Sequence, residues 1–255
     1  MPDNAITAWN PSKGLTLYGR KPALEALMDL SLAIHCLHLA DSNRPTGIIA
    51  QIIAAAEKRN VAVRYHDRQA LSRISKNGRQ DQGVALDVIC PGFLSLEAFL
   101  ALPDKPRTLL AIDGVTNPQN VGMIIRSAAA ASIDGLLYPK RGIASLGPLV
   151  IKASAGNIFR APIIRCETTT SAVSTLKAQG YRVAVLQASA SQSLFDYQPG
   201  GSMVCVLGGE SEGVGADVLA MADTELSVPM ANGVESLNVA VTASLAAFHL
   251  RRPAS

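Results

Sequence analysis

Along the first 90 residues, short apolar runs alternate with segments in which apolar residues recur at helical spacing. Short runs rich in β-branched residues are typical of strands, whereas recurrence every three to four residues is typical of amphipathic helices. The pattern predicts strands at 34–40, 61–67 and 83–90, and helices at 18–29, 46–59 and 68–75. We therefore expect residues 1–90 to form a small N-terminal α/β unit.

Residues 107–255 show the same alternation over a longer stretch. The run TLLAIDGV (108–115) is apolar almost throughout, which is typical of a strand covered on both faces of a parallel sheet. Further strands are predicted at 135–139, 162–166, 181–188, 202–208 and 224–230, and helices at 118–131, 148–155, 169–180 and 236–250. The pattern predicts an α/β domain whose parallel sheet has five or six strands.

The segment 91–106 separates the two predicted domains. It carries Pro91, Gly92, Pro103 and Pro106, and this density of proline and glycine predicts a weakly structured linker.

Composition narrows the class of protein. The chain has 255 residues, 48% of them hydrophobic and 17% charged, which indicates a compact globular protein rather than a disordered one. No apolar run reaches the ~18 residues that would span a bilayer. The first 14 residues lack the apolar core of a signal peptide, so we expect a cytoplasmic protein.

The cysteines and histidines predict no metal site. Four cysteines are scattered without C-x-x-C spacing, and free buried thiols are the expected state. In HCLH (35–38), neighbouring residues of a strand point to opposite faces, so these side chains cannot form one ligand cluster.

The distribution of charge is more informative than the net value of +3. Residues 58–79 contain seven basic residues and one acidic residue, a local charge of +6 that leaves −3 for the rest of the chain. Such a segment is either a solvated helix surface or a surface that binds a polyanion. The candidate RNA-binding residues within it are Arg64, Arg68, Arg73, Lys76 and Arg79.

Three loops follow predicted strands, at the edge of an open α/β sheet where ligands collect. In the first, Asn117 and Pro118 predict the start of a helix that carries Asn120 and Arg126. Taken alone, Arg126 is more simply explained as a solvent-facing side chain of an amphipathic helix.

The second loop, VLGGESEGVG (206–215), contains Gly208 and Gly209, where the backbone can approach a ligand closely. It lacks the spacings of dinucleotide and phosphate loops, and the acidic pair Glu210 and Glu212 opposes direct phosphate binding.

The third loop leads into the last predicted helix. Ser236 is a candidate helix N-cap, which would place Asn238 in the first helical turn. Small residues at 240, 243, 246 and 247 either fill a tightly packed core or let a partner helix approach closely.

Together and in this order, the three loops resemble the motifs of the SpoU-type RNA ribose 2′-O-methyltransferases, the TrmH family of the SPOUT superfamily. The matching stretches are NPQNVGMIIRSA, LGGESEGV and VPMANGVESLNVAVTASL, within a resemblance that covers 107–255. YGRKPALEAL (18–27) and DQGVALDV (81–88) are similar to the ends of the family's N-terminal SpoU substrate-binding domain. One departure is Asp81, where members often carry histidine.

The resemblance implies a fold, a cofactor and a set of site residues. The fold is a parallel-sheet domain with a deep C-terminal trefoil knot, and the cofactor is S-adenosyl-L-methionine. The implied cofactor-binding residues are Gly208, Gly209, Val228, Met230, Leu237 and Asn238. The implied catalytic residues are Arg126, Asn120, Glu210, Ser236 and Asn238, with Arg126 acting either as a base or as an electrostatic stabiliser.

The resemblance also implies a reaction and partners. A homodimer would transfer a methyl group to a ribose 2′-hydroxyl of RNA, with a guanosine or uridine of 23S ribosomal RNA as the expected target. Two alternatives stay open: a transfer RNA substrate, and a non-catalytic RNA-binding protein that retains the knotted fold. No membrane or metal is expected to take part.

Overall fold

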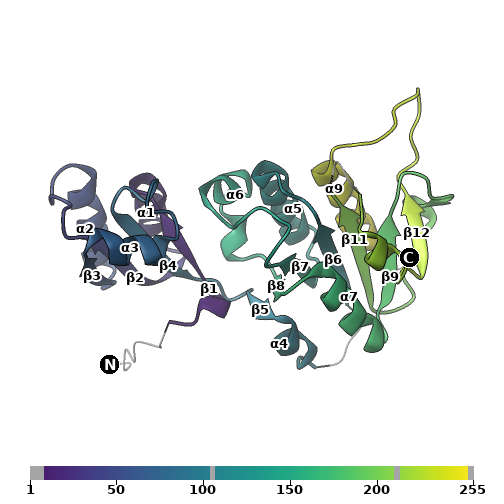
Figure 1. Ribbon diagram of the computed structural model, residues 1–255, viewed down its shortest axis with the longest axis horizontal. Coiled ribbons are helices and arrows are strands. Elements are labelled where there is room, and N and C mark those ends of the chain that lie inside the picture. Colours follow the sequence, from purple (N-terminus) through teal and green to yellow (C-terminus); the bar gives the residue numbers. More distant parts are fainter. Residues whose placement is uncertain (1–8, 104–106, 210–212, 252–255) are drawn as a thin grey trace. The chain divides into compact units, whose positions relative to one another are not determined.

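The computed structural model describes residues 9–103, 107–209 and 213–251 of the chain. The chain divides between Pro91 and Gly92 into two compact units, each described by itself below (Figure 1).

The N-terminal unit is built on a four-stranded sheet with the order β1-β4-β2-β3. Strands β2 and β3 run parallel, and the other pairs run antiparallel. Its elements are β1 (Gly14–Tyr18), α1 (Arg20–Met28), β2 (Ala33–Ala40), α2 (Ile48–Lys58), β3 (Ala62–His66), α3 (Arg68–Ser75) and β4 (Val84–Ile89).

Strand β1 is the element of this unit that the hydrophobic pattern does not predict. Its last residue, Tyr18, lies within the predicted helix 18–29, and the strand is stabilised by pairing with the distant β4 over its whole length. The helices follow the predicted apolar spacing. In α2, Ile49, Ile52 and Ala56 are buried, and in α3 Leu71 is buried against the sheet.

The C-terminal unit contains an eight-stranded, entirely parallel sheet, which confirms the predicted α/β class. The strand order is β10-β12-β9-β11-β6-β7-β8-β5, and the two strands beyond the predicted six, β5 and β10, have two residues each at the sheet edges. The strands are β5 (Leu94–Ser95), β6 (Thr108–Asp113), β7 (Gly135–Pro139), β8 (Ile163–Cys166), β9 (Arg182–Leu186), β10 (Gln192–Ser193), β11 (Met203–Gly208) and β12 (Thr224–Ser227). The α-helices are α4 (Leu96–Leu100), α5 (Pro118–Ala130), α6 (Pro148–Ala153), α7 (Thr169–Ala178), α8 (Ala216–Leu219) and α9 (Val239–Leu250).

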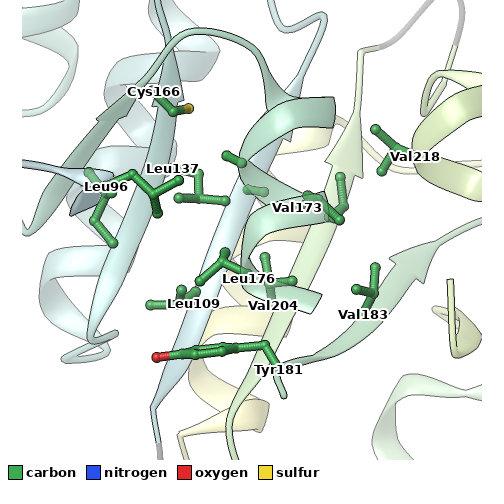
Figure 2. Close-up of a cluster of buried hydrophobic side chains, with 14 of the residues drawn as sticks. Leu96, Leu109, Leu137, Cys166, Val173, Leu176, Tyr181, Val183, Val204 and Val218 are labelled. Atoms are coloured by element: carbon green, nitrogen blue, oxygen red, sulfur yellow. The ribbon is translucent and has the colours of Figure 1, made fainter. Parts of the chain in front are cut away.

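Helix α7 covers one face of the sheet and completes the main hydrophobic core. Figure 2 shows Val173 and Leu176 of this helix above side chains such as Leu109, Val183 and Val204 from three neighbouring strands. All five side chains are fully buried. Because both faces of these strands are covered by protein, their sequences are apolar almost throughout.

The prediction of a weakly structured linker at 91–106 is wrong for its first part. Residues 94–100 form β5 and α4, and Phe93, Leu96 and Phe99 are buried in the C-terminal unit. These three aromatic or aliphatic residues recur every third position, a period that the prolines around them obscured. The guanidinium of Arg165 lies 4.8 Å from the centre of the Phe93 ring, which holds the segment against β8.

Helix α9 packs on α5, and the hydroxyls of Ser127 and Ser244 lie 2.7 Å apart between the two helices. Ala240, Ala243 and Ala247 of α9 are buried, so small residues of this helix contribute to packing within one chain. The strand order does not test the implied trefoil knot, which stays a prediction. Within the described residues, no helix is long and apolar enough to span a membrane.

Candidate active site

The carboxyl ends of the neighbouring strands β6 and β11 bring the first two candidate loops together. The strand register places Gly208 opposite Asp113, and the main chains of the loops that follow are in contact. A Cβ atom added to Gly209 would lie 2.4 Å from the carbonyl oxygen of Gly114. Only glycine allows this approach, so the glycine pair is required by the shape of the loop itself.

The glycine loop is fastened at several points along its length. A Cβ atom on Gly208 would lie 2.0 Å from the carbonyl carbon of Gly213, and the Gly213 amide donates to the Gly209 carbonyl at 3.1 Å. Farther along, the carboxylate of Asp113 accepts a hydrogen bond from the Gly215 amide at 3.0 Å. Glu210, the predicted catalytic residue of this loop, lies outside the described residues.

The start of α5 follows the prediction. Asn117 is the N-cap, its side chain accepts a hydrogen bond from the Gln119 amide at 2.9 Å, and Pro118 occupies the first helical turn. Gly122 is buried because α6 crosses α5 there. A Cβ atom at this position would lie 2.5 Å from the Cβ of Ala153.

The start of α9 differs from the prediction. Helix α9 begins at Val239, so Ser236 is not its N-cap. Asn238 is the N-cap, and its side-chain oxygen accepts from the Ala240 amide at 2.9 Å. The same side chain donates to the amide oxygen of Asn120 at 3.1 Å. Serine and asparagine are both common N-cap residues, so the sequence alone does not show whether Ser236 or Asn238 occupies the N-cap position.

Of the predicted catalytic residues, Asn120 and Asn238 are hydrogen-bonded to each other, whereas Arg126 lies on a different face of α5. Asn120 is 4% exposed and faces α9, whereas Arg126 is on the exposed side of α5. Six residues along an α-helix correspond to a rotation of about 240°, which accounts for the two different faces. Met123, 41% exposed, shares the outer face with Arg126.

The loop before α9 presents several of the predicted cofactor-binding residues to solvent. Val228 is half-buried, whereas Met230 and Leu237 are 36% and 37% exposed. Ser236 and Asn238 are exposed as well. This loop extends away from the sheet between β12 and α9 (Figure 1).

In the N-terminal unit, the five predicted RNA-binding residues are all exposed, and they lie on or beside β3 and α3. Arg68 also forms an ion pair with Asp81, with 3.6 Å between Nη1 and Oδ1. Asp81 is 1% exposed and accepts hydrogen bonds from the Ser75 hydroxyl and the Gly83 amide. The residue at which this chain departs from the family pattern therefore has a structural role.

Arg59, counted in the basic segment, is a structural residue. Its guanidinium donates to the carbonyl oxygens of Leu27 at 3.0 Å and Asp29 at 3.1 Å, and also to that of Leu32. The Leu27 carbonyl lies in the last turn of α1, where carbonyl groups lack partners within the helix, and the other two lie in the turn that follows. Arg59 therefore contributes to folding rather than to an open basic surface.

The cysteine thiols and the residues that could bind a metal are described in turn. All four cysteines are free and buried, as predicted. Burial raises the pKa of Cys166 and of Cys205 to about 12, so both stay protonated near neutral pH. Within the described ranges, no group of histidine, cysteine or acidic residues is arranged to hold a metal ion.

Comparison with known proteins places this site in a family. Residues 107–248 match the SpoU rRNA Methylase family, and residues 16–90 match the domain described as RNA 2′-O ribose methyltransferase substrate binding. A Staphylococcus saprophyticus protein assigned to the TrmH family of tRNA/rRNA methyltransferases is 30% identical over 93% of this chain and 95% of its own length. A Mycobacterium bovis protein described as an uncharacterized tRNA/rRNA methyltransferase is 32% identical over 90% of this chain and 71% of its own length.

Solved structures have the same fold. AviRb, a SpoU methyltransferase of Streptomyces viridochromogenes solved with AdoMet (S-adenosylmethionine), has a TM-score of 0.63 and 16% identity, covering 96% of this chain and 94% of its own. An AdoMet-bound rRNA methyltransferase of Sinorhizobium meliloti has a TM-score of 0.61 and 22% identity, covering 93% of this chain and 86% of its own. The chain belongs to the SpoU rRNA methylase family, and thus to the S-adenosylmethionine-dependent RNA methyltransferases.

Proposed function

We propose that this protein methylates a ribose 2′-hydroxyl of ribosomal RNA, using S-adenosylmethionine as the methyl donor. The observation that carries the proposal is that the first two motif loops meet at the carboxyl edge of one parallel sheet, where Asp113 and Gly208 end neighbouring strands. The helix that follows the first loop is bonded through Asn120 to Asn238, at the end of the third loop. The matched substrate-binding domain supports RNA ribose as the acceptor.

The residues at this edge fit the cofactor. The glycine loop offers main-chain groups, and Met230 and Leu237 of the exposed loop before α9 offer apolar surface. Main-chain polar groups beside apolar side chains suit an adenine ring. When bound, S-adenosylmethionine supplies an electrophilic methyl group. Gly208, Val228 and Leu237 would hold it through their main chains, as the resemblance implies.

Arg126 has the chemistry to position the RNA. An arginine side chain is positively charged throughout the physiological range and binds phosphate oxygens with two parallel hydrogen bonds. We infer that Arg126 binds a phosphate beside the target ribose and stabilises the negative charge that develops on the 2′-oxygen. Asn120, being buried, acts through Asn238, which is exposed at the start of α9.

The active form that fits these positions is a homodimer. Arg126 shares the outer face of α5 with the exposed Met123, and α9 exposes Val241 and Phe248 at 47% and 53%. Large apolar side chains on two adjacent helices are typical of a protein–protein contact. A second copy placed on this face would bring an Arg126 side chain near the loop that precedes α9. Light scattering of Phe248→Glu should then show a monomer, with wild-type protein as the dimeric reference.

A transfer RNA substrate is the second candidate, since the similar proteins carry the description tRNA/rRNA methyltransferase. Mapping of ribose methylation in RNA from a deletion strain and its parent separates the two. If one ribose methylation of ribosomal RNA is missing in the deletion strain, the proposal is supported. If the missing methylation is in transfer RNA, the reaction is as proposed but the substrate is transfer RNA.

The decisive variant is Arg126→Ala. We expect methyl transfer from labelled S-adenosylmethionine to fall to background, with the circular dichroism spectrum of the folded protein unchanged because the side chain is exposed within its own chain. Arg182→Ala is the matched control, an exposed arginine at the amino end of β9 that should retain full activity. Near-normal turnover by Arg126→Ala would show that the catalytic assignment is wrong.

A further inference from the structure

Asp113 joins two segments that are far apart in the sequence. It is the last residue of β6, it is half-buried, and its carboxylate Oδ2 accepts the Gly215 amide hydrogen at 3.0 Å across 102 positions of sequence. Within the described part of the chain, this is the one hydrogen bond recorded for the Asp113 carboxylate. Its partner lies at the far end of the glycine loop, immediately before α8.

The near end of the same loop is also fixed to the segment after β6. Gly209 packs so closely on Gly114 that any side chain there would overlap the Gly114 carbonyl. The loop is thus held at Gly209 by main-chain packing and at Gly215 by a hydrogen bond to a carboxylate. Hydrogen bonds to ionised groups are among the stronger ones in proteins, so the second attachment has the strength to fix the position of Gly215.

We propose that Asp113 is a positioning residue for methyl transfer, because it holds Gly215, the end of the glycine loop, in the place that binding of S-adenosylmethionine requires. The inference rests on the proposed function and adds a residue that the motif comparison did not assign. Asp113 acts through the Gly215 amide. It therefore affects the binding of the cofactor rather than the chemistry of the methyl group.

Two substitutions of Asp113 distinguish the effect of losing the hydrogen-bond acceptor from the effect of losing the negative charge. Asp113→Ala removes the acceptor, and Asp113→Asn retains an amide oxygen in the position of Oδ2 without the negative charge. We expect Asp113→Ala to raise the Kd and the KM for S-adenosylmethionine about tenfold, the effect of losing one hydrogen bond to a charged group, with the KM for RNA unchanged. Asp113→Asn should recover part of this loss, because a neutral amide oxygen still accepts the hydrogen bond but binds it less strongly than a carboxylate.

Thr169→Val provides a matched structural control. The Thr169 hydroxyl donates to the carbonyl oxygen of Ile112, the neighbour of Asp113 in β6, at 3.2 Å and is buried. Valine has nearly the same shape and removes only this bond. We expect Thr169→Val to lower the melting temperature without changing the affinity for S-adenosylmethionine, which separates a general loss of stability from a change in the loop.

The measurements are calorimetric titration with S-adenosylmethionine, steady-state kinetics with RNA, and amide hydrogen exchange of the peptides that cover 207–219. Faster exchange in Asp113→Ala, reversed by saturating cofactor, is expected. Wild-type affinity in Asp113→Ala would overturn the inference, and so would an Asp113→Asn variant as defective as Asp113→Ala. If Asp113→Ala does not fold, the exchange and affinity of Asp113→Asn decide alone. Failure of the wild-type protein to bind S-adenosylmethionine would instead overturn the proposed function.

Discussion

The side-chain amide of Asn238 donates to the amide oxygen of Asn120 at 3.1 Å, and this contact joins the start of α9 to the first turns of α5. The two residues are 118 positions apart in the chain. Asn238 also caps α9 through Ala240. One exposed side chain therefore sets both where the last helix begins and how it meets the helix that carries Arg126.

Substitution of Asn238 should affect stability and activity to different degrees. Asn238→Ala removes the cap, which costs about 1 kcal/mol of unfolding free energy, and leaves the buried Asn120 amide without this partner at a further cost of about 1–3 kcal/mol. Asn238→Ser retains a capping oxygen but is too short to bridge to α5. We expect Asn238→Ser to recover the cap contribution in urea unfolding while methyl transfer stays impaired. Equal activity in Asn238→Ser and the wild type would show that the bridge is dispensable.

Gly122 should tolerate no side chain. An added Cβ would lie 2.5 Å from the Cβ of Ala153 and 2.7 Å from the carbonyl oxygen of Val150, so α5 and α6 would have to move apart. Overpacking of this kind costs about 1–3 kcal/mol, and we expect thermal unfolding of Gly122→Ala at a clearly lower temperature. Gly200→Ala is the control, because nothing lies within 4 Å of an added Cβ there and its φ is not positive. Similar melting temperatures for both variants would contradict the close approach.

The basic residues around α3 should determine the salt dependence of RNA binding. Arg73, Lys76 and Arg79 are exposed, whereas reversal of Arg68 would also disturb its ion pair with the buried Asp81. We therefore choose the triple reversal Arg73→Glu, Lys76→Glu and Arg79→Glu. For single-stranded RNA, each lost phosphate contact should reduce the slope of log K against log salt by about 0.7. Fluorescence anisotropy across a salt series measures this slope.

Two observations serve as controls for the triple reversal. Its affinity for S-adenosylmethionine should equal that of the wild type, and Arg182→Glu should leave RNA affinity unchanged. A triple variant with the wild-type salt slope would indicate that the basic segment is only a solvated helix surface.

Sequence reasoning predicted features that depend on neighbours along the chain. Asn117 and Pro118 start α5 because the cap and the proline act within one turn, and the apolar run at 108–113 is a central strand because burial on both faces leaves no polar position. The contacts that fix the site depend on distant partners. A carboxylate that ends a buried strand, as Asp113 does, was a visible signal for a site residue, but nothing near it indicated Gly215 as its partner.

The same limit explains the errors. Seven basic residues in 22 indicated a positively charged surface. The charge count could not show that the Arg59 guanidinium is hydrogen-bonded to a carbonyl oxygen at the end of α1. At the start of α9, Ser236 and Asn238 are both good caps by residue type. The choice between them is made by the bond to Asn120, which lies on another helix.

A chain of polar side chains inside the N-terminal sheet makes stability depend on pH. His38, 6% exposed, lies between Asp87 and His66, with 3.0 Å to each, and Thr16 donates to the other oxygen of Asp87 at 2.6 Å. Burial lowers the pKa of His38, but the hydrogen bond to Asp87 and the neighbouring Cys36 outweigh it and raise the pKa to about 9. For His66, burial and the positive charge of His38 lower the pKa.

The two histidines act in opposite directions. The raised pKa of His38 gives stability that is fully present below pH 6.5 and is lost as the pH rises toward about 9, a loss of up to about 3 kcal/mol. The lowered pKa of His66 gives stability that is present above pH 6.5 and is lost as the pH falls. The N-terminal unit should therefore be most stable near pH 6.5. Urea unfolding of the whole protein from pH 5.5 to 9 measures this, with the transition of this unit followed by Trp9 fluorescence.

Comparison with His38→Gln isolates the contribution of His38 from other groups that titrate in this range. The difference in unfolding free energy between wild type and His38→Gln should shrink steadily from pH 6.5 to 9, because only the wild type loses a proton from a buried ion pair. Thr16→Val is the control. It removes the hydrogen bond to Asp87 without a titrating group, so its difference from the wild type should change much less with pH. A wild-type minus His38→Gln difference that stays constant over this range would mean that the imidazole between Asp87 and His66 is neutral.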